Sequence, residues 1–61
     1  MTLIAEREGE EVAKIFGPYR GNYVLEYRKP GSMQITRVRR SNLQGLRILA
    51  KLVFPGSIWK E

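Results

Sequence analysis

The fold is decided by residues 23–40, which read YVLEYRKPGSMQITRVRR. In its first part, residues 23–28, every second side chain is large and apolar: Tyr23, Leu25 and Tyr27. A period of two places these side chains on one face of a strand. The tyrosines suit two roles, stacking on bases or closing the core with their hydroxyls outward, and we favour the core.

A turn and a returning strand follow. Lys29-Pro30-Gly31-Ser32 suits a turn, because proline presets φ at the first central position and glycine allows a positive φ at the second. Residues 33–40 then pair back along the first strand. We expect Arg28 opposite residue 33, Tyr23 opposite residue 38, and a twist or bulge near Thr36, where the apolar side chains change face.

Two more strands are expected upstream, over residues 2–7 and 11–16, joined by a turn at Glu8-Gly9-Glu10. Residues 17–22, with Gly-Pro at one end and Gly-Asn at the other, are expected to form a loop.

A helix is expected over residues 42–54. Ser41 and Gln44 have the spacing of a capping box, and Pro55 ends the helix. A tail, residues 55–61, follows. At about 100° per residue, the apolar residues gather on half of the helix: Leu43, Leu46, Leu49, Ala50, Leu52, Val53 and Phe54.

These elements predict one α+β domain over residues 1–61. It consists of a small antiparallel β-sheet of three to four strands followed by one C-terminal α-helix packed on one face. Gly45 weakens a helix interior, and a close approach of the helix to the sheet would explain it.

The composition argues against an enzyme. The chain of 61 residues has no cysteine and no histidine, and aspartate is also absent. It therefore has no imidazole base, no thiol and no usual zinc ligands. Glu6, Glu8 and Glu10 stand at a period of two and suit a hard cation, but a solvated strand edge is the favoured interpretation. We expect no cofactor and no metal.

Charge is distributed unevenly. Residues 1–11 hold four glutamates and one arginine, whereas residues 12–61 hold ten cations and two glutamates. Such a basic run interleaved with aromatic residues is typical of a protein that binds a polyanion. We predict nucleic-acid binding, with duplex DNA favoured over RNA. The predicted contacts are Arg20, Arg28, Lys29, Arg37, Arg39, Arg40, Arg47 and Lys51.

A protein-interaction module is the alternative, of the kind that a phage or plasmid regulator uses to dock on an acidic protein. Its predicted interface is Phe54, Ile58 and Trp59. A chain this short has a small core and often gains stability from a partner, so a homodimer is also expected to be possible.

The element order over residues 11–54, three antiparallel strands and then a helix, resembles the DNA-binding domains of plant AP2-type factors and the arm domains of some tyrosine recombinases. In those families the sheet lies in the major groove. The short strands and the glycine-rich segment 17–21 are also similar to a small SH3-like or KOW-type barrel, although the helix is long for that fold. No diagnostic motif accompanies either resemblance, so no functional residue is transferred.

The first residues lack the basic and apolar segments of a signal peptide, and no apolar run is long enough to span a bilayer. We expect a cytoplasmic protein without a membrane partner, of a size typical of small prokaryotic or viral proteins.

Overall fold

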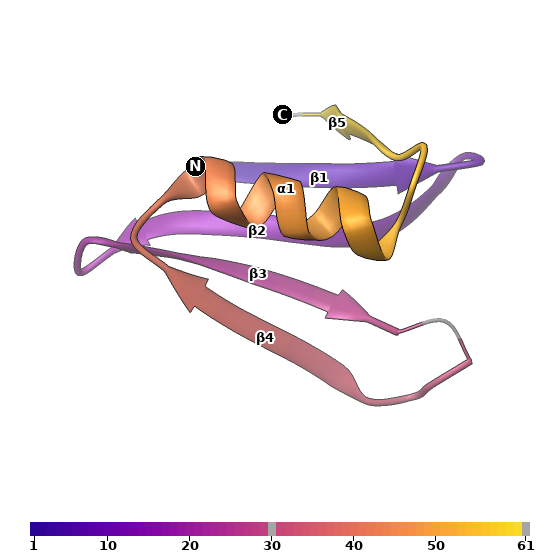
Figure 1. Cartoon of the computed structure of the whole chain (residues 1–61), viewed down its shortest axis with the longest axis horizontal. Coiled ribbons are helices and arrows are strands. Elements are labelled where there is room, and N and C mark those ends of the chain that lie inside the picture. The colour runs from indigo at the N-terminus through magenta and orange to yellow at the C-terminus, as the bar shows by residue number, and fades with distance from the viewer. Residues whose placement is uncertain (30, 61) are drawn as a thin grey trace.

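The computed structural model describes residues 1–29 and 31–60. In this part of the chain, five strands and one helix follow one another, with the helix between the last two strands (Figure 1). The elements are β1 (Thr2–Arg7), β2 (Glu10–Tyr19), β3 (Asn22–Arg28), β4 (Ile35–Arg40), α1 (Leu43–Val53) and β5 (Ile58–Lys60).

All strands belong to one antiparallel sheet with the order β4-β3-β2-β1-β5. The fold is therefore α+β as expected, but with five strands rather than three to four. The strand that the sequence did not indicate is β5, which pairs with β1 through Ala5 opposite Trp59. Three residues are too few to show an alternating pattern.

The first two hairpins turn in two residues each. Glu8 and Gly9 have φ of 56° and 80°, and Arg20 and Gly21 have φ of 52° and 79°. Positive φ at both central positions is the turn geometry that fits the twist of paired strands. The turn at Gly9 was expected. The loop predicted at residues 17–22 is wrong, because β2 continues to Tyr19.

The third hairpin has a longer connection than predicted. Ser32 N donates to Lys29 O at 3.0 Å, so the chain reverses where expected; Pro30, on which that prediction also rested, lies outside the described residues. Pairing resumes only at Ile35, opposite Arg28, and it places Arg40 opposite Tyr23. The predicted register was therefore two residues short.

No bulge interrupts this register within the described pairs of β3 and β4. Of the twist or bulge predicted near Thr36, the bulge is therefore wrong. The register places Thr36 opposite Tyr27 and Val38 opposite Leu25. Tyr27 and Leu25 are both buried, so Thr36 and Val38 lie on the core face of β4. Ile35 consequently lies on the other face.

The core contains side chains of the first three strands together with those of α1. Leu46 and Ala50 are buried in one cluster with Ile15 and Leu25. The ring of Tyr27 meets the ring of Phe54 edge to face, with centroids 5.9 Å apart. The tyrosines of β3 thus serve the core, as favoured. Leu52, expected on the apolar half of the helix, is instead 74% exposed.

The start of α1 differs from the predicted capping box. The side-chain oxygen Oδ1 of Asn42 accepts hydrogen bonds from Gln44 N at 2.9 Å and from Gly45 N at 3.4 Å. Asn42, not Ser41, is therefore the N-cap. Gly45 has no neighbour within 4 Å of a Cβ built on it, as far as the structure describes the chain, so close packing on the sheet does not explain it.

Candidate nucleic-acid interface

Three predicted arginines lie at one end of the sheet. Arg39 and Arg40 are the last residues of β4, opposite Val24 and Tyr23 near the start of β3. Arg20 forms the turn that leads into β3. Figure 1 shows this turn, the end of β4 and the start of α1 at the same end of the molecule. We call Arg20, Arg39 and Arg40 the arginine end.

The arginine end is exposed and has no acidic partner among the described residues. All three side chains are exposed, and none forms an ion pair within residues 1–29 and 31–60. Arg39 and Arg40 are consecutive in a strand, so their side chains leave it on opposite faces. The guanidinium of Arg40 donates to its neighbour's carbonyl, with Nη1 2.7 Å from Arg39 O.

An exposed aromatic side chain accompanies these arginines. Tyr19, the last residue of β2, is 71% exposed and directly precedes Arg20. Sequence reasoning missed this residue, because it lay in a segment predicted to be a plain loop. Its position between Gly17-Pro18 and Arg20 was the one feature of the sequence that could have indicated an exposed aromatic residue at a turn. An exposed ring beside cations can pack on a sugar or a base.

The face of the sheet away from α1 carries a second group of charges. Glu26 of β3 lies between Lys14 of β2 and Arg37 of β4 in register. Its carboxylate lies 3.6 Å from Lys14 Nζ and 2.9 Å from Arg37 Nε. The Arg37 hydrogen bond is the main reason that the pKa of Glu26 is lowered, with a smaller effect of the nearby Lys14 charge. Arg37 is therefore partly neutralised before any ligand arrives.

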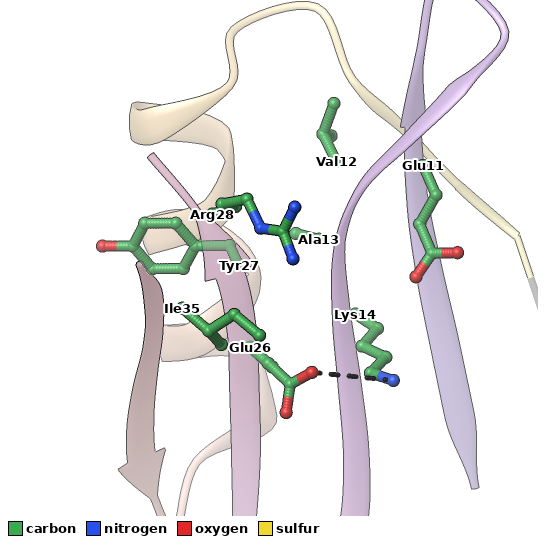
Figure 2. Close-up of a pocket in the computed structure, with 8 residues that line it drawn as sticks. All are labelled: Glu11, Val12, Ala13, Lys14, Glu26, Tyr27, Arg28 and Ile35. Carbon is green, nitrogen blue, oxygen red and sulfur yellow. Dashed lines mark ion pairs between the residues drawn. The ribbon is translucent and has the colours of Figure 1, made fainter. Parts of the chain in front are cut away.

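Arg28 lies beside a shallow hollow on this face, with a volume of about 300 Å³. Figure 2 shows its guanidinium extending toward β2, with the Lys14–Glu26 ion pair next to it. The lining residues are Glu11, Val12, Ala13, Lys14, Glu26, Tyr27, Arg28 and Ile35. Two acids balance two bases here, so the hollow is not a basic surface.

The remaining predicted cations lie elsewhere. Lys29 lies in the connection between β3 and β4. Arg47 and Lys51 lie on α1, where the Arg47 guanidinium carbon is 6.0 Å from the centroid of the Trp59 ring. The eight predicted contacts thus fall into separate groups, and the arginine end contains three of them that form no ion pair in the part of the chain that the structure describes.

The three residues predicted as a protein interface do not share a surface. Phe54 is only 3% exposed and belongs to the core, under the Arg7 guanidinium, so it is not available to a partner. Ile58 and Trp59 are neighbours in β5 and lie on opposite faces of the sheet. Ile58 is 60% exposed, whereas Trp59 is half-buried.

The N-terminal glutamates are also dispersed. Glu6 forms an ion pair with Lys60 at 3.1 Å, Glu8 is in a turn, and Glu10 pairs with Arg7 in register. Within the described chain, no three side chains of metal-binding type come together. None of its helices is long and apolar enough to cross a membrane.

Comparisons with protein-family models, with curated proteins and with solved structures give no match for this chain. The geometry and the charges are therefore the basis of the functional argument.

Proposed function

We propose that this protein is a non-enzymatic nucleic-acid-binding protein that holds duplex DNA at the arginine end. The observation that carries the proposal is the grouping of Arg20, Arg39 and Arg40 beside the exposed Tyr19, without an acidic partner in the described residues. Three guanidinium groups at one end of the sheet, none in an ion pair within the described residues, attract a polyanion.

Arginine suits phosphate contacts, because its planar group donates two parallel hydrogen bonds to phosphate oxygens. Such contacts fix the position of a protein on the duplex without reading its sequence. The hairpin of β3 and β4 lies at the edge of the sheet, and a two-stranded ribbon is narrow enough to enter a major groove.

The placement of the aromatic residues favours a duplex over a single strand. Proteins that bind single strands stack successive bases on exposed aromatic rings. In β3, however, Tyr27 is buried and Tyr23 packs against the core. In the part of the chain that the structure describes, Tyr19 is the one exposed aromatic side chain. One ring is too few to stack successive bases.

The other predicted cations of the strands and their connections, Arg28, Lys29 and Arg37, extend this proposed footprint with weaker contacts, and Arg47 and Lys51 of α1 are left outside it. Arg28 and Arg37 share their face with Glu26, and Lys29 lies in the connection between β3 and β4. The alternative function, docking on an acidic protein, was predicted to use Phe54, Ile58 and Trp59, and the burial of Phe54 does not favour that surface.

Binding to a short fluorescein-labelled duplex, followed by anisotropy at low salt, tests the proposal. Arg39→Glu is expected to raise Kd at least tenfold, about 1.4 kcal/mol. Lys51→Glu is the matched control, because it changes the net charge equally on an exposed residue of α1, and it is expected to change Kd less than about threefold.

Absence of binding by the wild-type protein at low salt would rule out this function. Equal losses in the two variants would show that the net charge acts without a localised site. Circular dichroism of both variants verifies that each retains the fold.

A further inference from the structure

The exposed side of α1 carries a pair of large apolar residues. Ile48 and Leu52 are four residues apart, and they are 62% and 74% exposed. On a helix this spacing places them next to each other on one face. Trp59 of β5 borders the same face. A groove of about 420 Å³ lies between this face of α1 and Trp59.

We call this feature the helix groove. Its lining residues are Gln44, Arg47, Ile48, Lys51, Leu52 and Trp59. Contiguous apolar side chains rimmed by polar ones are the usual composition of a docking site for another protein.

Gly45 is a second observation at the same surface. It is exposed and lies three residues before Ile48, so both side-chain positions are on neighbouring parts of the helix surface. Glycine is less favourable than alanine within a helix. In the described chain, no atom lies within 4 Å of the position that a Cβ would take at Gly45. A partner backbone passing close to α1 would use the space that this glycine leaves open.

The charges of the helix groove indicate the chemistry of the occupant. Among the described residues, Arg47 and Lys51 are the charged residues that line it, and no carboxylate does. A second copy placed by a two-fold axis would bring the same cations toward each other, which costs binding energy. An acidic partner gains from both cations.

We propose that the helix groove binds an amphipathic helical segment of a partner protein, with apolar residues on Ile48, Leu52 and Trp59 and acidic residues facing Arg47 and Lys51. An amphipathic helix laid in a hydrophobic groove is a common mode of peptide recognition. This surface is separate from the arginine end, so the inference does not depend on nucleic-acid binding.

The chain supplies its own reporter for a test, because Trp59 is its single tryptophan. The probe is a synthetic helical peptide without tryptophan, with leucine along one face and glutamate on the others. Two control peptides have lysine in place of every glutamate, or the same composition with the leucines scrambled. Each is titrated against the full chain while Trp59 fluorescence is recorded.

The acidic amphipathic peptide is expected to bind at least tenfold more tightly than either control peptide. Leu52→Glu is expected to weaken this binding at least tenfold. Met33→Glu is the matched control, because Met33 is 84% exposed in the β3–β4 connection, away from α1. This variant adds the same charge and is expected to leave Kd within about twofold.

Three results would overturn the proposal. The first is a scrambled peptide that binds as tightly as the amphipathic one, and the second is a loss of binding in Met33→Glu as large as in Leu52→Glu. Either result would show general attraction to a basic protein. The third is a wild-type dimer in sedimentation that Leu52→Glu dissociates, which would show that a second copy of this chain occupies the groove.

Discussion

The Oε2 atom of Glu26 accepts a hydrogen bond of 2.9 Å from Nε of Arg37, its neighbour across β3 and β4. This contact is the main cause of the lowered pKa of Glu26. A carboxyl group whose pKa is lower in the folded state binds protons more weakly there than in the unfolded state. It therefore adds stability at pH values above its unfolded pKa, and this contribution is lost as the pH falls through the folded value.

We predict that the free energy of unfolding decreases as the pH falls below 4.5, the ordinary value for this group. Glu26→Gln keeps the shape but cannot ionise, so it should show a smaller decrease over the same range. Urea unfolding at several pH values below and above 4.5 measures both proteins. Parallel curves for the two proteins would contradict the role of Glu26.

Leu46 anchors α1 in the core, where it is fully buried. We predict that Leu46→Ala lowers the free energy of unfolding by about 2–5 kcal/mol, from lost burial and the cavity that remains. A chain of this size has only roughly 3–9 kcal/mol in total, so much of the variant should be unfolded. Leu52→Ala, on the same helix but exposed, should change stability by less than about 0.5 kcal/mol. Similar losses in both variants, measured by urea unfolding, would show that α1 is not held as described.

Asn42 caps the start of α1 through two hydrogen bonds to backbone N–H groups. We predict that Asn42→Ala costs about 1 kcal/mol, because these donors lose their acceptor. Ser41→Ala removes the side chain that the sequence pattern favoured, and it should have almost no effect. Thermal unfolding of the two variants shows which residue is the N-cap. A larger loss of stability in Ser41→Ala than in Asn42→Ala would contradict the structure.

Gly45 offers a stabilising substitution. A Cβ at this position meets nothing within 4 Å in the described chain. We therefore predict that Gly45→Ala raises the free energy of unfolding by about 0.5–1 kcal/mol, through higher helix propensity. Chemical unfolding measures this gain. A loss of stability would reveal an unfavourable contact that the structure does not show.

Much of the fold was predictable from local patterns. The alternation of Tyr23, Leu25 and Tyr27 predicted which side chains of β3 face the core, and the glycine at position 9 predicted the first turn. The helix was predictable from its apolar spacing and from Pro55 after its end. These features depend on residues close together in the chain, so a sequence pattern carries them.

The rest depends on distant partners. Ile58–Lys60 becomes a strand only because β1 offers it a free edge, and no local pattern marks such a short strand. The β3–β4 register depends on how far the connection extends beyond its turn. Leu52 lies six residues after the buried Leu46, which at about 100° per residue places it about 120° around the helix, at the margin of the apolar half. Which part of that half faces the sheet is decided by the packing of α1.

The candidate site was predictable in part. Charge counting identified the basic residues, and the hairpin pattern placed Arg39 and Arg40 near Arg20. The sequence did not indicate that Glu26 pairs with Arg37 and Lys14. It also did not indicate that Arg47 and Lys51 border an apolar groove. Which cations remain uncompensated depends on contacts between strands, and these follow only from the register.

The most direct test of the central claim is the salt dependence of duplex binding. If the arginine end and one or two further cations neutralise phosphates, log K should fall with log salt at a slope of about −4. Arg39→Ala should make this slope shallower by about one unit, whereas Lys51→Ala should leave it unchanged. A slope near zero, or equal changes in both variants, would contradict a phosphate-binding site at the arginine end.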